Sequence, residues 1–178
     1  MRKITYTWEQ RKLGQISTTY SGGTPKVGRN DYYDGDIPFI RSGEIHQSTT
    51  ELTLTEKGLN ESSASMVSKG TLLYALYGAT SGEVAISKQN GAINQAILAI
   101  IPNKNYDNEF LCQILEKKKN EIVDTFLQGG QGNLSAAIIK NLHLSLPDFK
   151  EQSAIGVFFH NIDNLITLHQ RLGKNMTM

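Results

Sequence analysis

The sequence predicts an α+β fold of short, mostly antiparallel strands with helices and glycine-rich loops, followed by one long C-terminal helix. Two strand-like segments, 71–77 and 83–87, flank a tight glycine-containing connection and predict an antiparallel hairpin. Apolar residues spaced by three and four over 149–172 predict a helix with one apolar stripe. A chain of 178 residues has the size of one compact domain with an appendage. We therefore divide it into a body (1–147), a helix (148–172) and a tail (173–178).

The N-terminal part of the body reads as strands separated by loops. Residues 8–16 predict a short strand that leads into a turn of helix, and the glycines and proline of 21–30 predict a long exposed loop. Residues 36–41 predict a short edge strand, because a proline cannot donate a backbone hydrogen bond, and 42–44 predict the turn after it. The serine- and threonine-rich segment 48–65 predicts loops around a short helix.

The rest of the body alternates between strands and a helix. After the hairpin, residues 93–101 predict one further strand that Pro102 ends. Residues 108–126 carry apolar residues at a helical period with a lysine-rich solvent face. The glycines of 128–133 then break that helix, and the alternation over 142–146 predicts a last strand.

The C-terminal helix has a sharply defined start. Asp148 and Glu151 form a variant capping box, in which the Asp148 carboxylate accepts from a first-turn N–H and Glu151 reaches back. A helix over 149–172 would be roughly 35 Å long at ~1.5 Å per residue, and Gly173 is expected to end it. The stripe either packs onto its own body or extends beyond it toward a partner. Its residues are Ile155, Phe158, Phe159, Ile162, Leu165, Ile166 and Leu172.

Composition restricts the function. A net charge of +1 argues against nucleic-acid binding by bulk electrostatics alone. Residues 1–41 hold seven basic against four acidic residues, a net charge of +3, so any DNA surface would be local. The single cysteine, Cys112, excludes an internal disulfide, and the sequence has neither a secretory segment nor a membrane-length apolar run. We therefore expect a cytoplasmic protein without a membrane partner.

The sequence contains no recognisable catalytic motif. Residues 78–82 lack the Gly-Lys-Ser/Thr end of a phosphate-binding loop, and 130–132 lack the third glycine of a dinucleotide motif. The four histidines form no His-Glu-x-x-His pair and have no cysteine cluster beside them, so no metal site is expected. No serine or cysteine nucleophile with its base is recognisable. The sequence therefore predicts a binding protein, not an enzyme, that needs no cofactor.

Several short motifs occur in a fixed order over 8–171. They are Trp8-Glu9-Gln10-Arg11-Lys12-Leu13-Gly14, Ser21-Gly22-Gly23-Thr24-Pro25, Asp36-Ile37-Pro38-Phe39-Ile40-Arg41, Val67-Ser68-Lys69-Gly70-Thr71-Leu72-Leu73, Asn94-Gln95-Ala96, Asn133-Leu134-Ser135, and Leu146-Pro147 with Glu151-Gln152-Ser153-Ala154-Ile155. Together they resemble one half of the specificity subunit of a type I restriction-modification system, a target-recognition domain with its conserved helix. The family's helix usually runs on where 172–178 ends this one. We therefore expect a half-subunit, such as a truncated gene product or a recombination cassette.

The resemblance implies a function for each part. The body would read one half of a bipartite double-stranded DNA target. The helix would dock methyltransferase subunits and, through them, the restriction subunit, which supply the catalysis. In a whole subunit two such helices pair antiparallel, so two copies of this chain would form a homodimer. The alternative is a truncated fragment that competes for methyltransferase subunits without productive DNA recognition.

The predicted loops hold the side chains that such a function needs. Arginine reads guanine and asparagine or glutamine reads adenine in the major groove, while Lys26 and Arg29 suit phosphates and glycines allow close backbone approach. The candidate DNA-binding residues are Thr24, Lys26, Arg29, Arg41, Ser42, Tyr77, Gly78, Ser81, Asn94, Gln95, Gln128, Gly130, Gln131, Gly132 and Asn133. The candidate partner-helix residues are Ile155, Phe158, Phe159, Ile162, Leu165 and Ile166.

Some of these residues have a structural alternative. Arg41 would instead form an ion pair with Glu44 or Asp36. Asn94 and its neighbour Gln95 open an apolar strand and would pair with backbone groups, and Tyr77 would belong to the core.

Overall fold

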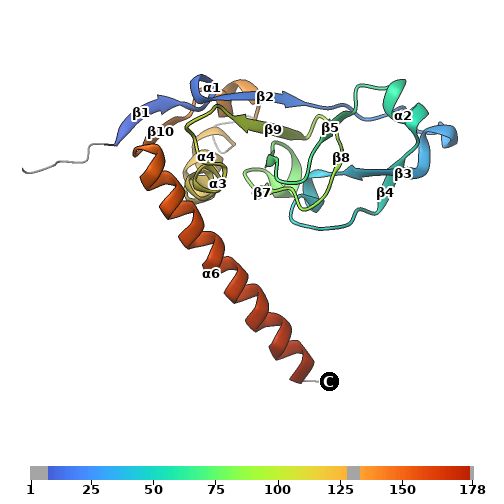
Figure 1. The fold of residues 1–178 in the computed structure, drawn as a ribbon. Helices are drawn as coiled ribbons and strands as arrows, with labels where there is room; N and C mark the ends of the chain where they lie inside the picture. The colour runs from blue at the N-terminus through green and yellow to red at the C-terminus, as the bar shows by residue number, and fades with distance from the viewer. Residues whose placement is uncertain (1–7, 128–132, 177–178) are drawn as a thin grey trace, which may run out of the picture.

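The computed structural model describes residues 8–127 and 133–176, in which the strands form three sheets (Figure 1). A two-stranded sheet pairs β1 (Glu9–Lys12) with β10 (His143–Leu146). A four-stranded sheet has the order β2 (Ser17–Ser21), β9 (Ile97–Pro102), β6 (Leu72–Ala75), β7 (Val84–Ile86). A second has the order β4 (Leu52–Leu54), β3 (Tyr33–Ile40), β8 (Gly91–Ile93), β5 (Ser65–Val67). Apart from the parallel pair β3 and β8, the pairings are antiparallel, which confirms the predicted α+β class.

The helices are mostly short, and one is long. The α-helices are α1 (Leu13–Ile16), α2 (Glu56–Asn60), α3 (Asn108–Lys117), α4 (Lys119–Phe126), α5 (Ala136–Lys140) and α6 (Phe149–Met176). Three short 3-10 helices are η1 (Asn30–Tyr32), η2 (Ser42–Glu44) and η3 (Gly78–Thr80). In Figure 1, α6 begins beside β10 and α3 and then runs away from the sheets.

The sheet that contains β6 and β9 is the middle layer of the body. Successive side chains of a strand point to opposite faces, so this sheet buries apolar residues on both sides. One face packs on α1, α3, α4 and α5 in the main core, which includes Leu72, Tyr74, Leu98, Ile100, Leu111 and Leu115. The other face packs on the second four-stranded sheet through Leu73, Ala75, Ile97, Ala99, Ile40 and Ile93.

The predicted strand over 93–101 is in fact two strands in different sheets. β8 ends at Ile93, and β9 begins at Ile97. Between them the Asn94 side-chain oxygen accepts from the Ala96 N–H at 3.0 Å, a side-chain turn that competes with strand pairing. The 94–96 turn therefore lies where the two sheets meet.

Three further expectations need correction. Pro38 lies in an inner strand, where the β8 pairing begins only at Phe39, so no ladder bond from Pro38 to β8 is required. The segment 48–65 contains the strand β4 besides the predicted helix, and its last residue begins β5. The predicted helix over 108–126 is divided at Lys118 into α3 and α4.

The Asp148 half of the predicted capping box at the start of α6 is confirmed. The Asp148 carboxylate accepts from the Glu151 N–H at 2.9 Å. The helix does not stop at Gly173 but continues to Met176. Within the described residues, no helix combines the length and apolarity that crossing a membrane requires.

Candidate nucleic-acid interface

The loops that follow β3, β6 and β8 meet where the two four-stranded sheets adjoin. The Leu76 N–H donates to the Ala96 carbonyl at 2.8 Å, and the Leu134 N–H donates to the Leu76 carbonyl at 3.1 Å. The Gly22 N–H donates to the Asn94 carbonyl at 3.3 Å. We call the segments joined in this region the junction loops: 22–24, 41–51, 76–83, 94–96 and 133–135.

Two of the predicted site residues contact each other directly. The Thr24 hydroxyl donates to the Gln95 side-chain oxygen at 2.9 Å, and both side chains are exposed. This contact depends on the close approach of the two loops at Gly22, where an added Cβ would lie 1.8 Å from the Ile93 carbonyl oxygen. The Asn94 side-chain oxygen is used in its own turn, and the Gln95 oxygen accepts from Thr24, so Gln95 presents its exposed amide nitrogen.

At the hairpin tip the Tyr77 and Ser81 side chains stabilise the fold. Tyr77 is half-buried and packs against the main core. Ser81 is buried, and its hydroxyl donates to the carbonyls of Leu76 (3.3 Å) and Gly78 (2.8 Å). Gly78 is exposed and has a φ of 79°, a conformation that favours glycine. The tip therefore presents the backbone of Gly78 rather than the Tyr77 or Ser81 side chain.

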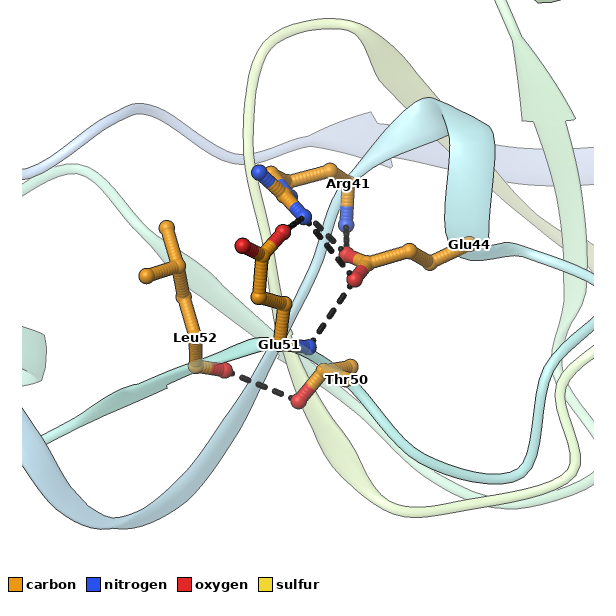
Figure 2. Close-up of polar contacts among 5 residues, drawn as sticks. All are labelled: Arg41, Glu44, Thr50, Glu51 and Leu52. Carbon is orange, nitrogen blue, oxygen red and sulfur yellow. Dashed lines mark hydrogen bonds and ion pairs between the residues drawn. The ribbon is translucent and has the colours of Figure 1, made fainter.

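Arg41 lies at the end of β3 and is held by two carboxylates (Figure 2). Its Nε and Nη2 donate to the two oxygens of Glu44, each at 3.0 Å, and Nη2 also donates to Glu51. The structure thus realises the ion pair with Glu44 rather than the one with Asp36. Ser42, the next residue, is half-buried in η2.

Glu44 is buried yet ionised. Burial opposes its charge, but hydrogen bonds from the Arg41 side chain and from the Glu51 and Arg41 backbone outweigh it, so the pKa of Glu44 lies below its ordinary value. The same two carboxylates raise the pKa of Arg41. This network fixes both ends of the segment between η2 and β4.

Arg29 lies away from the junction loops, next to η1 at the other end of β3, which is about 23 Å long at ~3.3 Å per residue. Its Nε and Nη2 donate to Asp31 at 2.7 Å each, and its guanidinium lies 4.3 Å from the centre of the Tyr32 ring. Lys57 also pairs with Asp31 at 2.7 Å. Lys26, by contrast, is exposed and makes no ion pair with another described residue.

The glycine-rich loop after α4 is only partly described. Gln128, Gly130, Gln131 and Gly132 lie outside the described residues. Asn133, at the end of this loop, is exposed beside the Leu134 contact to β6.

The base of α6 is anchored to the N-terminus of α3. The buried Gln152 accepts from the Asp107 N–H at 3.1 Å and donates to the Pro147 carbonyl at 2.8 Å. The Ser153 hydroxyl donates to the Asp107 carboxylate at 2.9 Å. A Cβ at Gly156 would lie 2.6 Å from that carboxylate, so the helix approaches as closely as glycine allows.

Further along, polar pairs continue this contact. His160 Nδ1 lies 3.3 Å from the Glu109 carboxylate, and the Gln113 amide donates to Asp163 at 3.2 Å. Residues 153, 156, 160 and 163 recur at three and four, so they occupy one face of α6, the face toward α3.

The predicted apolar stripe occupies a different face of α6. Of the predicted residues, Ile155 packs against the main core. Phe158 is 59% exposed and Leu165 is 65% exposed, while the rings of Phe158 and Phe159 contact each other edge to face at 5.5 Å. Beyond its anchored base, the helix therefore does not fold back onto its body. We call this set the free face: Phe158, Phe159, Ile162, Leu165 and Ile166, of which Ile162 is half-buried and the other four are exposed.

A family model described as the type I restriction modification DNA specificity domain matches residues 6–176. The chain belongs to this family.

Curated relatives support the same assignment. The chain is 30% identical over 172 residues to the type I restriction enzyme MjaIX specificity subunit of Methanocaldococcus jannaschii, covering 92% of the chain and 40% of the relative. It is 23% identical over 167 residues to the EcoR124I/EcoR124II specificity subunit of Escherichia coli, covering 88% and 41%. This specificity domain thus spans about two fifths of the length of these relatives.

Solved structures share the fold. A chain from a structure titled as the structural basis of complex assembly and conformational transition of the type I R-M system superposes with a TM-score of 0.71 at 18% identity, covering 95% of this chain and 41% of the other. The HsdS subunit from Thermoanaerobacter tengcongensis superposes with a TM-score of 0.69 at 16% identity, covering 95% and 40%.

Neither a metal-ligand cluster nor an exposed thiol occurs in the described part of the specificity domain. No group of three or more His, Cys, Asp or Glu side chains in residues 8–127 and 133–176 is placed to hold a metal ion. Cys112 is buried, and burial raises the pKa of its thiol to about 12, which keeps it protonated at neutral pH.

Two features of the junction loops were not predicted. Gln47, Ser48 and Thr49 are exposed on the segment between η2 and β4. Glu83 joins His46 (3.0 Å) to Lys119, which ties this segment to the hairpin and to α4. The serine- and threonine-rich composition of 48–65 predicted loops, but only the pairing of β3 with β4 places the start of that segment at the junction.

Proposed function

We propose that this specificity domain reads one half of a bipartite double-stranded DNA target and docks methyltransferase subunits, and through them the restriction subunit, with α6. In this proposal the chain is a non-catalytic recognition component. The observation that carries it is the separation of two surfaces: polar loops gather at the junction of the sheets, while the free face of α6 remains uncovered away from the body.

The charges support binding that depends on partners. Arg29 and Arg41 are committed to carboxylates, which leaves Lys26 as the more available phosphate contact of the three. DNA affinity that rests on few phosphate contacts is weak and varies little with salt. We expect methyltransferase subunits to enclose the duplex and to add most of the affinity.

The free face supports helix pairing. Burial of a phenylalanine, leucine or isoleucine side chain contributes about 1.5 to 3 kcal/mol. The partner surface would belong to a methyltransferase subunit or, in an antiparallel homodimer, to α6 of a second copy. A dimer would present two recognition bodies to a symmetric split target.

The test is a gel-shift series with randomised duplexes, with and without the cognate methyltransferase. Enrichment of particular base pairs in the bound fraction supports recognition. Binding to methyltransferase without any base preference would instead support the competing-fragment alternative. Light scattering across protein concentration measures the homodimer: a monomer at high concentration would exclude it.

A further inference from the structure

The segment between η2 and β4 has both of its ends fixed by one buried side chain. Glu44 is 7% exposed. Its carboxylate accepts from the Arg41 N–H at 3.2 Å and from the Glu51 N–H at 2.9 Å, besides the Arg41 side chain. A loop held in this way loses less conformational entropy when it binds a ligand. Residues 45–50 are therefore a preorganised part of the junction loops.

This segment faces the same region as the hairpin tip. η2 lies against η3, and His46 Nε2 lies 3.0 Å from the Glu83 carboxylate just beyond that tip. Its outward residues Gln47, Ser48 and Thr49 are exposed and polar.

The local charge disfavours phosphate. Arg41 is bonded to two carboxylates, so this group of three side chains carries a net charge of about −1. The Nε and Nη2 edge of Arg41, which would read a guanine, is occupied by Glu44. A negative site attracts hydrogen-bond donors instead, and the amino groups of cytosine and adenine are the donors in the major groove.

Glu51 is placed to accept from such a donor. Its side chain is 75% exposed, and Arg41 holds its carboxylate (Figure 2). Glu51 and Gln47 both line a hollow of about 680 Å³. Glutamate accepts from cytosine N4, and a glutamine amide pairs with both N6 and N7 of adenine.

We infer that Gln47 and Glu51 read base edges that carry an amino group, adenine N6 or cytosine N4, in the major groove. Arg41 is then a positioning residue that holds Glu51, not itself a base reader. The inference rests on the proposed function and names the residues that give it specificity.

The experiment is selection from randomised duplexes by the chain together with its methyltransferase subunits, followed by sequencing of the bound DNA. Gln47→Ala and Glu51→Gln should each lose about 5- to 150-fold discrimination at one or two adjacent positions and keep the others. Arg41→Lys, which keeps the charge but not the fork, should weaken the preference at the Glu51 position. Glu56→Gln is the matched control, because it removes an exposed carboxylate from α2 and should leave every preference unchanged.

The outcomes separate the two proposals. If the wild-type chain selects a sequence and neither Gln47→Ala nor Glu51→Gln changes any position, the inference is wrong and the proposed function stands. A uniform loss at all positions, with an unchanged melting temperature, would also overturn it. A wild-type chain without any base preference overturns the proposed function itself.

Discussion

The junction loops and the free face of α6 are both exposed, but they are built in opposite ways. In the junction loops, polar side chains are held by the fold: Glu44 fixes both ends of a segment, and Gly22 lets two loops meet. On the free face, apolar side chains such as Phe158 and Leu165 are more than half exposed. The difference suits two kinds of binding, since base reading needs fixed donors and acceptors, whereas helix docking needs uncovered apolar area.

The free face offers the most direct test of this difference. The double substitution Leu165→Glu and Ile166→Glu should weaken binding to the helix partner by about 3 to 6 kcal/mol, because two buried apolar side chains are lost. Both residues are exposed, so the free energy of unfolding should change by only about 0.5 kcal/mol. Titration calorimetry and thermal melting measure the two quantities. Asn164→Glu is the control on another face of α6, and an equal loss there would contradict a defined free face.

At the junction the expected effect is on stability. Gly22→Ala should lower the free energy of unfolding by about 3 kcal/mol, because the added Cβ meets the Ile93 carbonyl oxygen and forces the loops apart. Denaturant unfolding measures it. Gly43→Ala is the matched control in the same region, since nothing lies within 4 Å of its Cβ. A wild-type stability for Gly22→Ala would mean that the loops are not held as described.

The anchor of α6 tests whether the helix is part of the body. Gln152→Ala should destabilise the chain by about 1 to 3 kcal/mol, because the Asp107 N–H and the Pro147 carbonyl lose their buried partner. Hydrogen exchange should show faster exchange at the start of α3 and α6, with the junction loops unchanged. Ala154→Ser, at an exposed position of the same turn, should have little effect.

The smallest effect is the pH dependence of stability that Glu44 contributes at the junction. The folded pKa of Glu44 lies below the ordinary 4.5, so the unfolded carboxyl takes up protons first as the pH falls. Its contribution is complete above about pH 4.5 and is lost as the pH falls through the folded pKa. Glu44→Gln should flatten this acid limb of the stability curve. Gln152→Ala should keep it, and a flattened limb in both variants would argue against Glu44 as its source.

Local signals in the sequence predicted local structure. The hairpin over 71–87, the Asp148 cap and the apolar stripe of α6 were predictable because each depends on residues a few positions apart. The Arg41 ion pair with Glu44 was one of two predicted alternatives, and its third member Glu51 was not predicted. That carboxylate belongs to the residue just before β4, and only the β3–β4 pairing brings it near.

The long-range arrangement of the segments could not be predicted from the sequence. Residues 91–101 form an almost continuous apolar run, and nothing local says that it divides between two sheets at Asn94. The face of α6 toward α3 was also hidden, because its contacts use Ser153, Gly156 and Asp163 rather than apolar side chains. The free face was predictable from the sequence because its side chains are apolar.

Gly156 gives α6 the mechanics of a lever. From this residue to Met176 the helix extends about 30 Å, at ~1.5 Å per residue. A tilt of about 5° at the Asp107 contact would swing the far tip by roughly 2.6 Å over that length. A methyl group added at Gly156 would therefore disturb a partner bound at the tip of α6 much more than it would disturb the body.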